Sequence, residues 1–258
     1  MNSGAGKVAI VTGASKGMGR HFVDALVGQG WQVAALARPS AELDLLGAAY
    51  GDKVIALSCD VSASKAVADA VAETVARFGR LDLVVNNAAA FEPFLLDSAT
   101  DAQIEGQIAL NLTGVIWMMR AAIPHLKASF GQIVTISSES VSHPFPMLGV
   151  YAATKAAVEA LSAGLREELR GEGVRVSVLR SGSVAGSTAS AAWDPAVTQE
   201  FYRRIVASGH AAMSGEPATP ESMAQALLAM ISLPPDVSAD LVEVRAARSG
   251  LPAGAKAL

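Results

Sequence analysis

A tyrosine and a lysine four residues apart form the pair of side chains in this sequence best suited to acid–base chemistry. They stand in the run Tyr151-Ala-Ala-Thr-Lys155, and residues four apart lie on one face of a helix. A free phenol has a pKa of about 10 and is a poor base at neutral pH. A neighbouring ammonium group favours the phenolate and lowers that pKa toward the working range. The pair therefore predicts a phenol that exchanges a proton with a bound substrate.

A serine at the end of a predicted strand offers a second polar group. Ser138 follows the apolar run Gln132–Ser137 and precedes Tyr151 by thirteen residues. Ligands of open α/β sheets bind at the carboxyl ends of the strands, so a hydroxyl at this position lies at the binding edge. We therefore expect Ser138 and Tyr151 to belong to one site.

A glycine-rich loop directly follows the first predicted strand and precedes a predicted helix. Its glycines have the spacing G-x-x-x-G-x-G instead of G-x-G-x-x-G. Glycines there let the backbone turn tightly and approach a pyrophosphate at the positive end of a helix. An ordinary strand–helix turn is the alternative interpretation. The residues predicted to contact a dinucleotide are Gly13, Ser15, Lys16, Gly17, Met18 and Gly19, of which Met18 is also a candidate for a simple core contact.

The end of the second predicted strand carries an arginine where a protein built for NAD would have an acid. An acid near this point holds the ribose 2′-hydroxyl of NAD, whereas an arginine accommodates the 2′-phosphate of NADP. Arg38 follows Ala37 here, and Lys16 adds a second cation from the glycine-rich loop. Solvated surface charges are the alternative, but together the two cations favour NADP, with NAD bound more weakly. After the third strand, Asp60 is a candidate acceptor for the adenine amino group, with Val61 beside it; helix capping is its other interpretation.

Short β-branched runs alternate with longer helical patterns, and these elements must position the groups above. The predicted strands are Lys7–Thr12, Gln32–Ala37, Lys53–Ser58, Leu83–Asn86, Gln132–Ser137, Val174–Leu179 and Leu241–Arg245. Most are apolar on both faces, as parallel strands covered by helices must be. Helices lie between them, for example Ser64–Phe78, which ends at Gly79. Repeated strand–helix units predict an α/β fold, a doubly wound parallel sheet of about seven strands with helices on both faces.

The length of the chain and the continuity of this pattern predict one domain over residues 1–258. The stretch 181–220 interrupts the pattern and is rich in serine, alanine, glycine and proline. Loops of that length are usually functional. We expect this stretch to be a substrate-binding flap with a short helix around 195–208.

Composition excludes several classes of protein. A net charge of −4 leaves no basic face for nucleic acid. Cys59 is the one cysteine, which excludes a disulfide framework or a thiolate metal cluster, and no metal site is expected. No run of about 18 apolar residues is long enough to span a membrane, and the first residues do not resemble a signal peptide. A cytoplasmic protein without a membrane partner is therefore expected.

Taken together, the motifs resemble the short-chain dehydrogenase/reductase family over nearly the whole chain. The resemblance rests on Thr12-Gly13-x-x-x-Gly17-x-Gly19, Asn86-Asn87-Ala88, Asn111, Ser138 and Tyr151-x-x-x-Lys155. It implies a Rossmann fold of seven parallel strands and a catalytic tetrad of Asn111, Ser138, Tyr151 and Lys155. It also implies that Asn87 and Ala88 border the cofactor.

The same resemblance implies a role for each member of the tetrad. Tyr151 is the general acid in ketone reduction and the base in alcohol oxidation. Ser138 hydrogen-bonds the substrate oxygen, and Lys155 holds the nicotinamide ribose. Lys155 and an oxidised nicotinamide both favour the Tyr151 phenolate and lower its pKa. Asn111 kinks its helix and positions a water in the proton relay.

Two stretches depart from the family's usual pattern. The glycine that usually follows the Asn-Ala pair is Ala89 here. After the sixth strand, the usual Pro-Gly-x-Val-x-Thr is replaced by Ser181-Gly182-Ser183-Val184-Ala185-Gly186. The proline and the threonine are missing, but the backbone of Val184 remains available to hold the nicotinamide carboxamide. Thr188 is a candidate replacement for the threonine.

Large apolar side chains surround the predicted site in the sequence. They are Phe91, Phe94, Phe145, Met147, Leu148, Trp193, Phe201, Tyr202 and Met213. Ordinary packing under a flap would also explain them. If they line the site, the pocket suits a hydrophobic ketone or secondary alcohol better than a sugar. The prediction is an NADP(H)-dependent oxidoreductase that interconverts a ketone and a secondary alcohol; the alternatives are a non-catalytic nucleotide-binding regulator and an epimerase or dehydratase on the same fold.

Small residues cover more than one face of the predicted helix from Val150 to Arg170. Alanines at positions 152, 153, 156, 157, 160 and 163 are too many for a single core-facing stripe. Small side chains suit close helix packing across a two-fold axis. We therefore expect a homotetramer or a homodimer.

Overall fold

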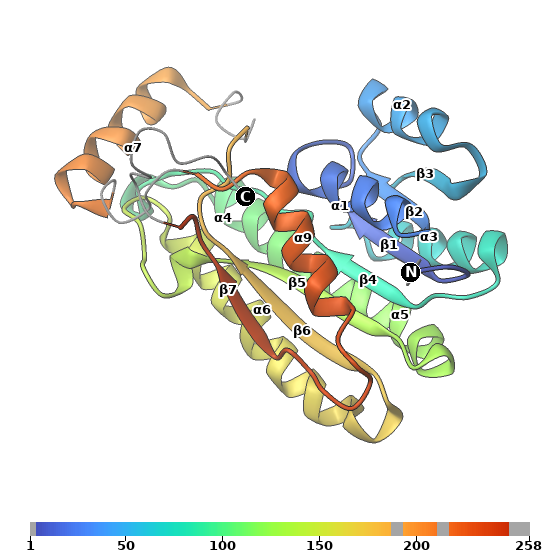
Figure 1. Ribbon diagram of the computed structural model, residues 1–258. Helices are drawn as coiled ribbons and strands as arrows, with labels where there is room; N and C mark the ends of the chain where they lie inside the picture. Colours follow the sequence, from blue (N-terminus) through green and yellow to red (C-terminus); the bar gives the residue numbers. More distant parts are fainter. Residues whose placement is uncertain (1–3, 187–192, 211–216, 248–258) are drawn as a thin grey trace, which may run out of the picture.

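The computed structural model describes residues 4–186, 193–210 and 217–247, and a seven-stranded sheet forms its centre (Figure 1). The strands are β1 (Val8–Thr12), β2 (Gln32–Ala37), β3 (Val54–Ser58), β4 (Leu83–Asn86), β5 (Gln132–Ser138), β6 (Arg175–Ser181) and β7 (Leu241–Val244). All six neighbouring pairs are parallel, in the order β3-β2-β1-β4-β5-β6-β7. The order reverses between β1 and β4, and ligands of such sheets bind beyond the carboxyl ends of the strands at that point.

Helices cover both faces of the sheet. They are α1 (Gly17–Gly28), α2 (Ala41–Tyr50), α3 (Ser64–Phe78), α4 (Asp101–Ile108), α5 (Gly114–Ser129), α6 (Gly149–Leu169), α7 (Pro195–Ala207) and α9 (Pro220–Ile231). Figure 1 shows α1 and α9 side by side, and both contribute to the hydrophobic core on one face. Helices α3, α5 and α6 contribute to the core on the other face.

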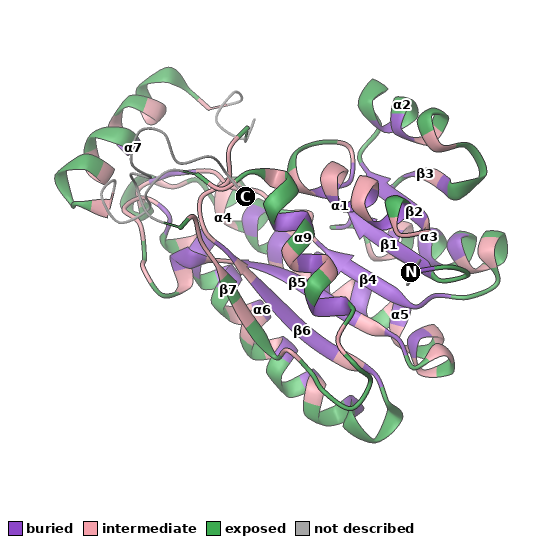
Figure 2. Cartoon of the chain, viewed as in Figure 1, coloured by how far each residue is buried: buried purple, intermediate pink, exposed green. Residues whose placement is uncertain are grey.

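The strands separate these two cores because successive side chains point to opposite faces. In β1, Ala9 and Val11 pack into one core while Val8 and Ile10 pack into the other. Figure 2 shows the inner strands buried along their length. Strand β7 lies at the edge of the sheet and is only half-buried. The predicted doubly wound α/β fold is therefore confirmed.

Most element bounds agree with the sequence predictions to within one or two residues. Helix α3 spans the predicted residues and ends at Gly79, whose φ of 82° is the left-handed conformation that glycine adopts easily. The largest difference is in β6, which continues to Ser181. There Ser181 pairs with Ser138 on one side and with Val244 on the other. The strand thus runs on through the position where the usual proline is missing.

Within the described residues, no helix is long and apolar enough to cross a membrane.

Candidate active site

The glycine-rich loop between β1 and α1 has the backbone geometry that its glycines predict. Gly13 and Gly17 have φ of 65° and 54°, a region that side chains disfavour. A Cβ on Gly19 would lie 2.1 Å from the Gly13 carbonyl oxygen, so only glycine lets the loop fold this tightly. A Cβ on Gly17 would meet open space. The N-cap of α1, Lys16, makes no side-chain capping bond, which leaves the first N–H groups of the helix for an anion.

Asn87 braces this loop from the end of β4. Its side-chain amide donates to the carbonyl oxygens of Thr12 and Gly13, at 2.9 and 3.3 Å. In return the Thr12 hydroxyl accepts from the backbone N–H groups of Asn87 and Ala88, at 2.9 and 3.0 Å. The loop shape is therefore fixed by contacts between β1 and β4, on either side of the reversal in strand order.

A cavity of about 450 Å³ opens beside the loop. Of the predicted cofactor-binding residues, it brings together Gly13, Ser15, Lys16, Arg38, Asp60, Val61, Asn87 and Ala88. The remaining lining residues are Ala37, Pro39, Ser40, Glu42, Cys59, Ala89 and Leu110. Gly17, Met18, Gly19, Tyr151, Lys155 and Val184 do not line it. Met18 instead packs on the core and lies against Ser181, with its sulfur 3.8 Å from the serine hydroxyl, which agrees with the core-contact interpretation.

The cavity holds an acid that sequence reasoning missed. Glu42, in the first turn of α2, lines the same space as Lys16 and Arg38. Its own backbone N–H, the Ser40 hydroxyl and the charge of Lys16 hold the pKa of this carboxyl below its usual range. Ser40 caps α2 by accepting from the N–H of Leu43 at 3.3 Å. A serine before a predicted helix is a recognisable start signal and could have placed Glu42 in the first turn.

Asp60 lines the cavity, as expected of a cofactor contact, but it does not cap helix α3. Its carboxylate accepts from the backbone N–H and the hydroxyl of Ser62, at 2.9 and 2.7 Å. These bonds, together with the more distant charge of Arg38, lower the pKa of Asp60. The capping residue of α3 itself is Ala63, so Asp60 shapes the turn before the helix without capping it.

Three of the four predicted tetrad residues meet where β5 ends and α6 begins. Ser138 is the last residue of β5, and Tyr151 and Lys155 lie in the first two turns of α6. Tyr151 is 9% exposed and Lys155 is 4% exposed. Burial raises the pKa of Tyr151; a hydrogen bond with the Ser138 side chain opposes this, and the charge of Glu139 adds to it. Ser138 therefore contacts the phenol that the sequence predicted to be its neighbour.

The buried Lys155 bonds to the strand and not to the Tyr151 hydroxyl that it was predicted to influence. Its Nζ donates to the carbonyl oxygen of Ile136 on β5 at 2.9 Å and lies 5.8 Å from the ring centroid of Tyr151. Burial lowers the pKa of Lys155 to about 8. The sequence predicted that this ammonium and an oxidised nicotinamide together lower the pKa of Tyr151. In the protein alone that pKa is raised, because the cost of burying the phenolate dominates.

Asn111 lies in a π-helical turn, Ala109–Thr113, between α4 and α5. Such turns interrupt helices and are frequent at functional sites, and the one here is the predicted irregularity. The side chain is fully buried. Its Oδ1 accepts from the N–H of Ala90 at 2.7 Å, and its Nδ2 donates to the Ala90 carbonyl at 2.9 Å and to the Thr154 hydroxyl at 3.2 Å. Asn111 therefore joins the segment after β4 to helix α6.

Tyr151 belongs to a small aromatic cluster outside the two main cores. The Phe91 ring meets the Tyr151 ring edge-on at 5.0 Å between centroids, and Trp193 lies 5.3 Å from Phe91. Phe201 on α7 contacts both Phe91 and Trp193. The Trp193 indole N–H also donates to the Phe91 carbonyl at 3.1 Å. Leu148, Phe145 and Met147 complete this cluster, Phe94 is buried nearby in the chain, Tyr202 is 54% exposed, and Met213 lies outside the described residues.

The first described residues of the predicted flap, after β6, pair with residues near its other end. Val184 forms a parallel bridge with Ala218. The Ala185 N–H donates to the Ala218 carbonyl and the Ala218 N–H donates to the Ser183 carbonyl, at 2.8 and 2.9 Å. These bonds use the carbonyl of Ser183 and the N–H of Ala185, so the N–H and the carbonyl of Val184 itself point away from Ala218. Thr188 lies outside the described residues.

Within the described part of the chain, no group of three or more histidine, cysteine or acidic side chains could hold a metal ion.

Comparison with known proteins relates this geometry to one family. A family model described as short chain dehydrogenase matches residues 7–196. L-fucose dehydrogenase from Oryctolagus cuniculus is 37% identical over 187 residues, which are 70% of this chain and 63% of that enzyme. The alignment therefore spans less than two thirds of the length of this relative.

Solved structures agree with the sequence match. The closed form of a serine dehydrogenase complexed with NADP+ has a TM-score of 0.82 and 27% identity, covering 96% of this chain and all of that one. A 3-ketoacyl-(acyl-carrier-protein) reductase from Brucella melitensis complexed with NADH has a TM-score of 0.79 and 25% identity. The match covers 93% of this chain and 97% of that one.

Proposed function

The chain belongs to the short-chain dehydrogenase/reductase family, and on that premise we propose that it is an NADP(H)-dependent oxidoreductase that interconverts a ketone and a secondary alcohol. One observation carries this proposal. A buried phenol, Tyr151, meets the Ser138 hydroxyl at the carboxyl edge of the sheet, with the buried ammonium of Lys155 one helical turn away. These groups can deliver or remove a proton at a substrate oxygen.

Each polar group has a distinct task in this reaction. Tyr151 gives its proton to the carbonyl oxygen in reduction and removes the hydroxyl proton in oxidation. The Ser138 hydroxyl hydrogen-bonds the same oxygen and fixes its place. Lys155 holds the nicotinamide ribose, and its charge acts with that of an oxidised nicotinamide to favour the phenolate against the cost of burial. Both side-chain N–H groups of Asn111 donate to protein atoms, so a water that Asn111 positions binds its main chain or its Oδ1, not these N–H groups.

The glycine-rich loop and the adjoining cavity fit a dinucleotide. Tight glycine turns and uncapped N–H groups at α1 suit a pyrophosphate, and Asp60 and Val61 line the space for an adenine. The Val184 backbone would hold the carboxamide. The nicotinamide, when bound, supplies or accepts the hydride.

Two cations favour NADP over NAD. The guanidinium of Arg38 suits bidentate binding of the 2′-phosphate, and Lys16 lines the same cavity. A hydrogen bond to a charged group contributes roughly 1.5–3 kcal/mol, so one such contact gives about ten- to a hundredfold preference. Glu42 in that cavity opposes the preference through its negative charge. Dissociation constants for both nucleotides test this, and tighter binding of NAD would contradict it.

The substrate we propose is apolar. Phe91 packs against the Tyr151 ring, and Trp193 and Phe201 pack against Phe91. Such walls bind hydrocarbon groups, and a few polar groups then orient the reacting oxygen. We further propose that residues 1–258 form one domain and that 181–220 act as its substrate-binding flap.

Turnover of a substrate panel tests the function. The purified protein is mixed with NADPH or NADH and acetophenone or 2-octanone, and separately with NADP+ or NAD+ and L-fucose or sorbitol. Nicotinamide absorbance should fall in the first set if the ketone is reduced and rise in the second if the alcohol is oxidised. We expect NADPH to be consumed stoichiometrically with an apolar ketone. Nucleotide binding without turnover of any compound would favour a regulator. Conversion of a compound without net change in the nucleotide would favour an epimerase or dehydratase.

A further inference from the structure

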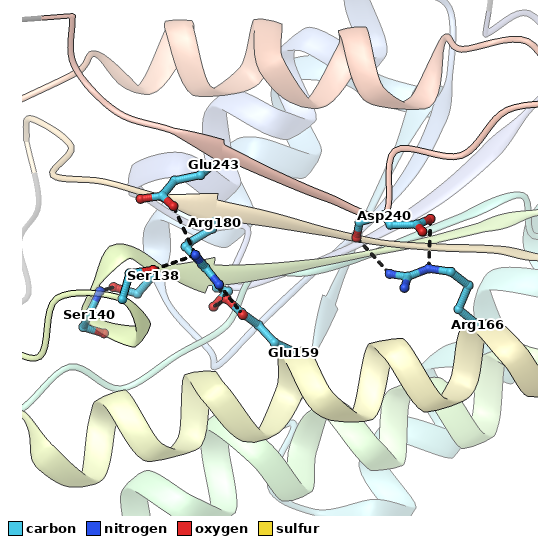
Figure 3. Close-up of polar contacts among 9 residues, drawn as sticks. Ser138, Ser140, Glu159, Arg166, Arg180, Asp240 and Glu243 are labelled. Atoms are coloured by element: carbon cyan, nitrogen blue, oxygen red, sulfur yellow. Dashed lines mark hydrogen bonds and ion pairs between the residues drawn. The ribbon is translucent and has the colours of Figure 1, made fainter.

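A partly buried ion pair joins helix α6 to the end of strand β6, close to the proposed catalytic groups. Arg180 donates from Nε to Glu159 Oε1 at 2.9 Å and from Nη2 to Oε2 at 2.6 Å. The two side chains are only 15% and 13% exposed. Figure 3 shows the guanidinium lying between the strands and the helix that carries Glu159. A bidentate pair of this kind fixes both the distance and the relative orientation of its partners.

Ser137 is the third member of this contact. Its hydroxyl donates to Glu159 Oε1 at 2.6 Å, and Ser137 and Arg180 are direct partners on the neighbouring strands β5 and β6. The next residue along β5 is Ser138, the proposed contact of the substrate oxygen. Glu159 therefore holds Ser137, the residue directly before Ser138, and so limits the movement of Ser138.

The helix presents its polar groups to β5 at a regular interval. Tyr151, Lys155 and Glu159 are spaced four residues apart, so they share one face of α6. Lys155 donates to the carbonyl oxygen of Ile136, and Glu159 accepts from Ser137, the following residue. Two successive turns of the helix are thus tied to two successive residues of the strand that ends at Ser138.

The charges keep the pair in place. Burial acts to raise the pKa of Glu159, but hydrogen bonds from Arg180 and Ser137 outweigh it and hold the pKa below its usual range. Bonds to Glu159 and Glu243 raise the pKa of Arg180, against the effect of burial. Arg180 also donates to Glu243 at 3.1 Å and to the Ser142 hydroxyl at 2.6 Å. Each of the three guanidinium nitrogens therefore donates at least one hydrogen bond, and these bonds hold the group in this orientation.

We propose that Glu159 and Arg180 are positioning residues, which hold Ser137 and helix α6 so that the Ser138 hydroxyl and the Tyr151 phenol face one substrate oxygen. This role rests on the proposed function, because it requires that Ser138 and Tyr151 act together. Neither Glu159 nor Arg180 lines the cofactor cavity, so we assign the pair a structural role in the site and not a direct contact with the nucleotide.

The double variant Glu159→Leu/Arg180→Met tests this role. Replacing a buried ion pair by apolar residues of similar size is often tolerated by the fold, whereas the tie to Ser137 is lost. We expect kcat for acetophenone reduction to fall about ten- to a hundredfold, since small misplacements of reacting groups cost that much. The dissociation constant for NADPH, measured by fluorescence, should change less than about threefold, because the pair does not line the cofactor cavity.

An NMR measurement on the Tyr151 ring tests the positioning without any enzymatic turnover. The chain has three tyrosines, so ¹³C-labelled tyrosine gives few ring Cζ resonances, and Tyr151→Phe assigns the one of interest. Its resonance should move in the double variant because the hydrogen bond with Ser138 changes. If the unaltered protein reduces no ketone in the panel, the proposed function fails, and this resonance still tests the positioning.

Arg166→Met is the matched control. Arg166 also lies on α6 and pairs with Asp240 at 3.1 Å, but further along the helix than Glu159 (Figure 3). We expect it to leave kcat and the Tyr151 resonance unchanged. An unchanged kcat and resonance in the double variant, or equal losses in Arg166→Met, would overturn the proposal. If the double variant does not fold, Arg180→Lys keeps the charge without the planar fork; full kcat in that variant would also overturn it.

Discussion

The side-chain amide of Asn111 donates a hydrogen bond to the Thr154 hydroxyl across 3.2 Å, and both residues are buried. Thr154 in turn donates to the carbonyl oxygen of Tyr151 at 2.7 Å. Asn111 also makes two bonds to Ala90, in the segment after β4. A continuous chain of hydrogen bonds therefore connects the π-helical turn to the first turn of α6. We infer that Asn111 orients the helix that carries Tyr151 and Lys155.

Thr154→Val should lower the free energy of unfolding by about 1–3 kcal/mol, because a buried Asn111 N–H then loses its partner. The substitution keeps the shape of the side chain, so packing changes little. Urea unfolding followed by circular dichroism measures the difference. Thr198→Val is the control, because that hydroxyl bonds an exposed helical carbonyl, and it should change stability by less than about 0.5 kcal/mol. Equal losses in the two variants would contradict this account of Asn111.

Tyr151→Phe should lower kcat at least about 10²-fold, since it removes the proton donor while the aromatic ring remains. The dissociation constant for NADPH should stay close to that of the unaltered protein. Steady-state kinetics and a binding titration measure the two quantities. Tyr202→Phe, at a tyrosine that is 54% exposed, should leave both unchanged. Near-full turnover of Tyr151→Phe would show that another group delivers the proton.

Glu42→Gln should tighten NADP binding about two- to fivefold, because it removes an exposed negative charge from the cavity that holds Arg38 and Lys16. NAD lacks the 2′-phosphate, so its affinity should change little. Isothermal titration with each nucleotide separates the two effects. Asp44→Asn, on the same helix but outside the cavity lining, is the control. An equal gain for NAD would indicate a contact with the shared part of the nucleotide.

Burying the Lys155 ammonium lowers the stability of the folded protein by an amount that depends on pH, and Lys155→Met should remove this dependence. Burial lowers the pKa of Lys155 to about 8 from an unperturbed 10.5, so between these values the unfolded chain binds more protons than the folded one. The stability of the unaltered protein relative to the variant should therefore rise with pH across this window, by roughly 3 kcal/mol in total. Urea unfolding of both proteins at several pH values measures it. A difference independent of pH would mean that the Lys155 pKa is ordinary.

We also propose a homotetramer assembled through helix α6. Ala153, Ala156, Ala160 and Ala163 are exposed on this helix, so the small residues that the sequence placed on a second face lie at the surface. Small side chains allow two helices to approach closely across a two-fold axis. Light scattering at micromolar concentration measures the mass. A monomer would contradict the proposal, and a dimer would limit the assembly to one interface.

The sequence by itself determined the strands, the glycine-rich loop and the spacing of the tetrad. These features follow from local chemistry: apolar runs of strand length, glycines at a tight turn, and a tyrosine and lysine one helical turn apart. The bounds of α3 and the identity of the Ser138–Tyr151 contact could be predicted for this reason.

Only the tertiary structure decided how these groups are held and charged. Glu42 enters the cavity because α2 folds back beside the glycine-rich loop, and Arg180 meets Glu159 because β6 lies against α6. Burial, which raises the pKa of Tyr151 where the sequence predicted a lower value, depends on the packing of segments far apart in the chain. Spacing reveals which residues share a helix face, but desolvation and long-range ion pairs arise only when distant segments pack together.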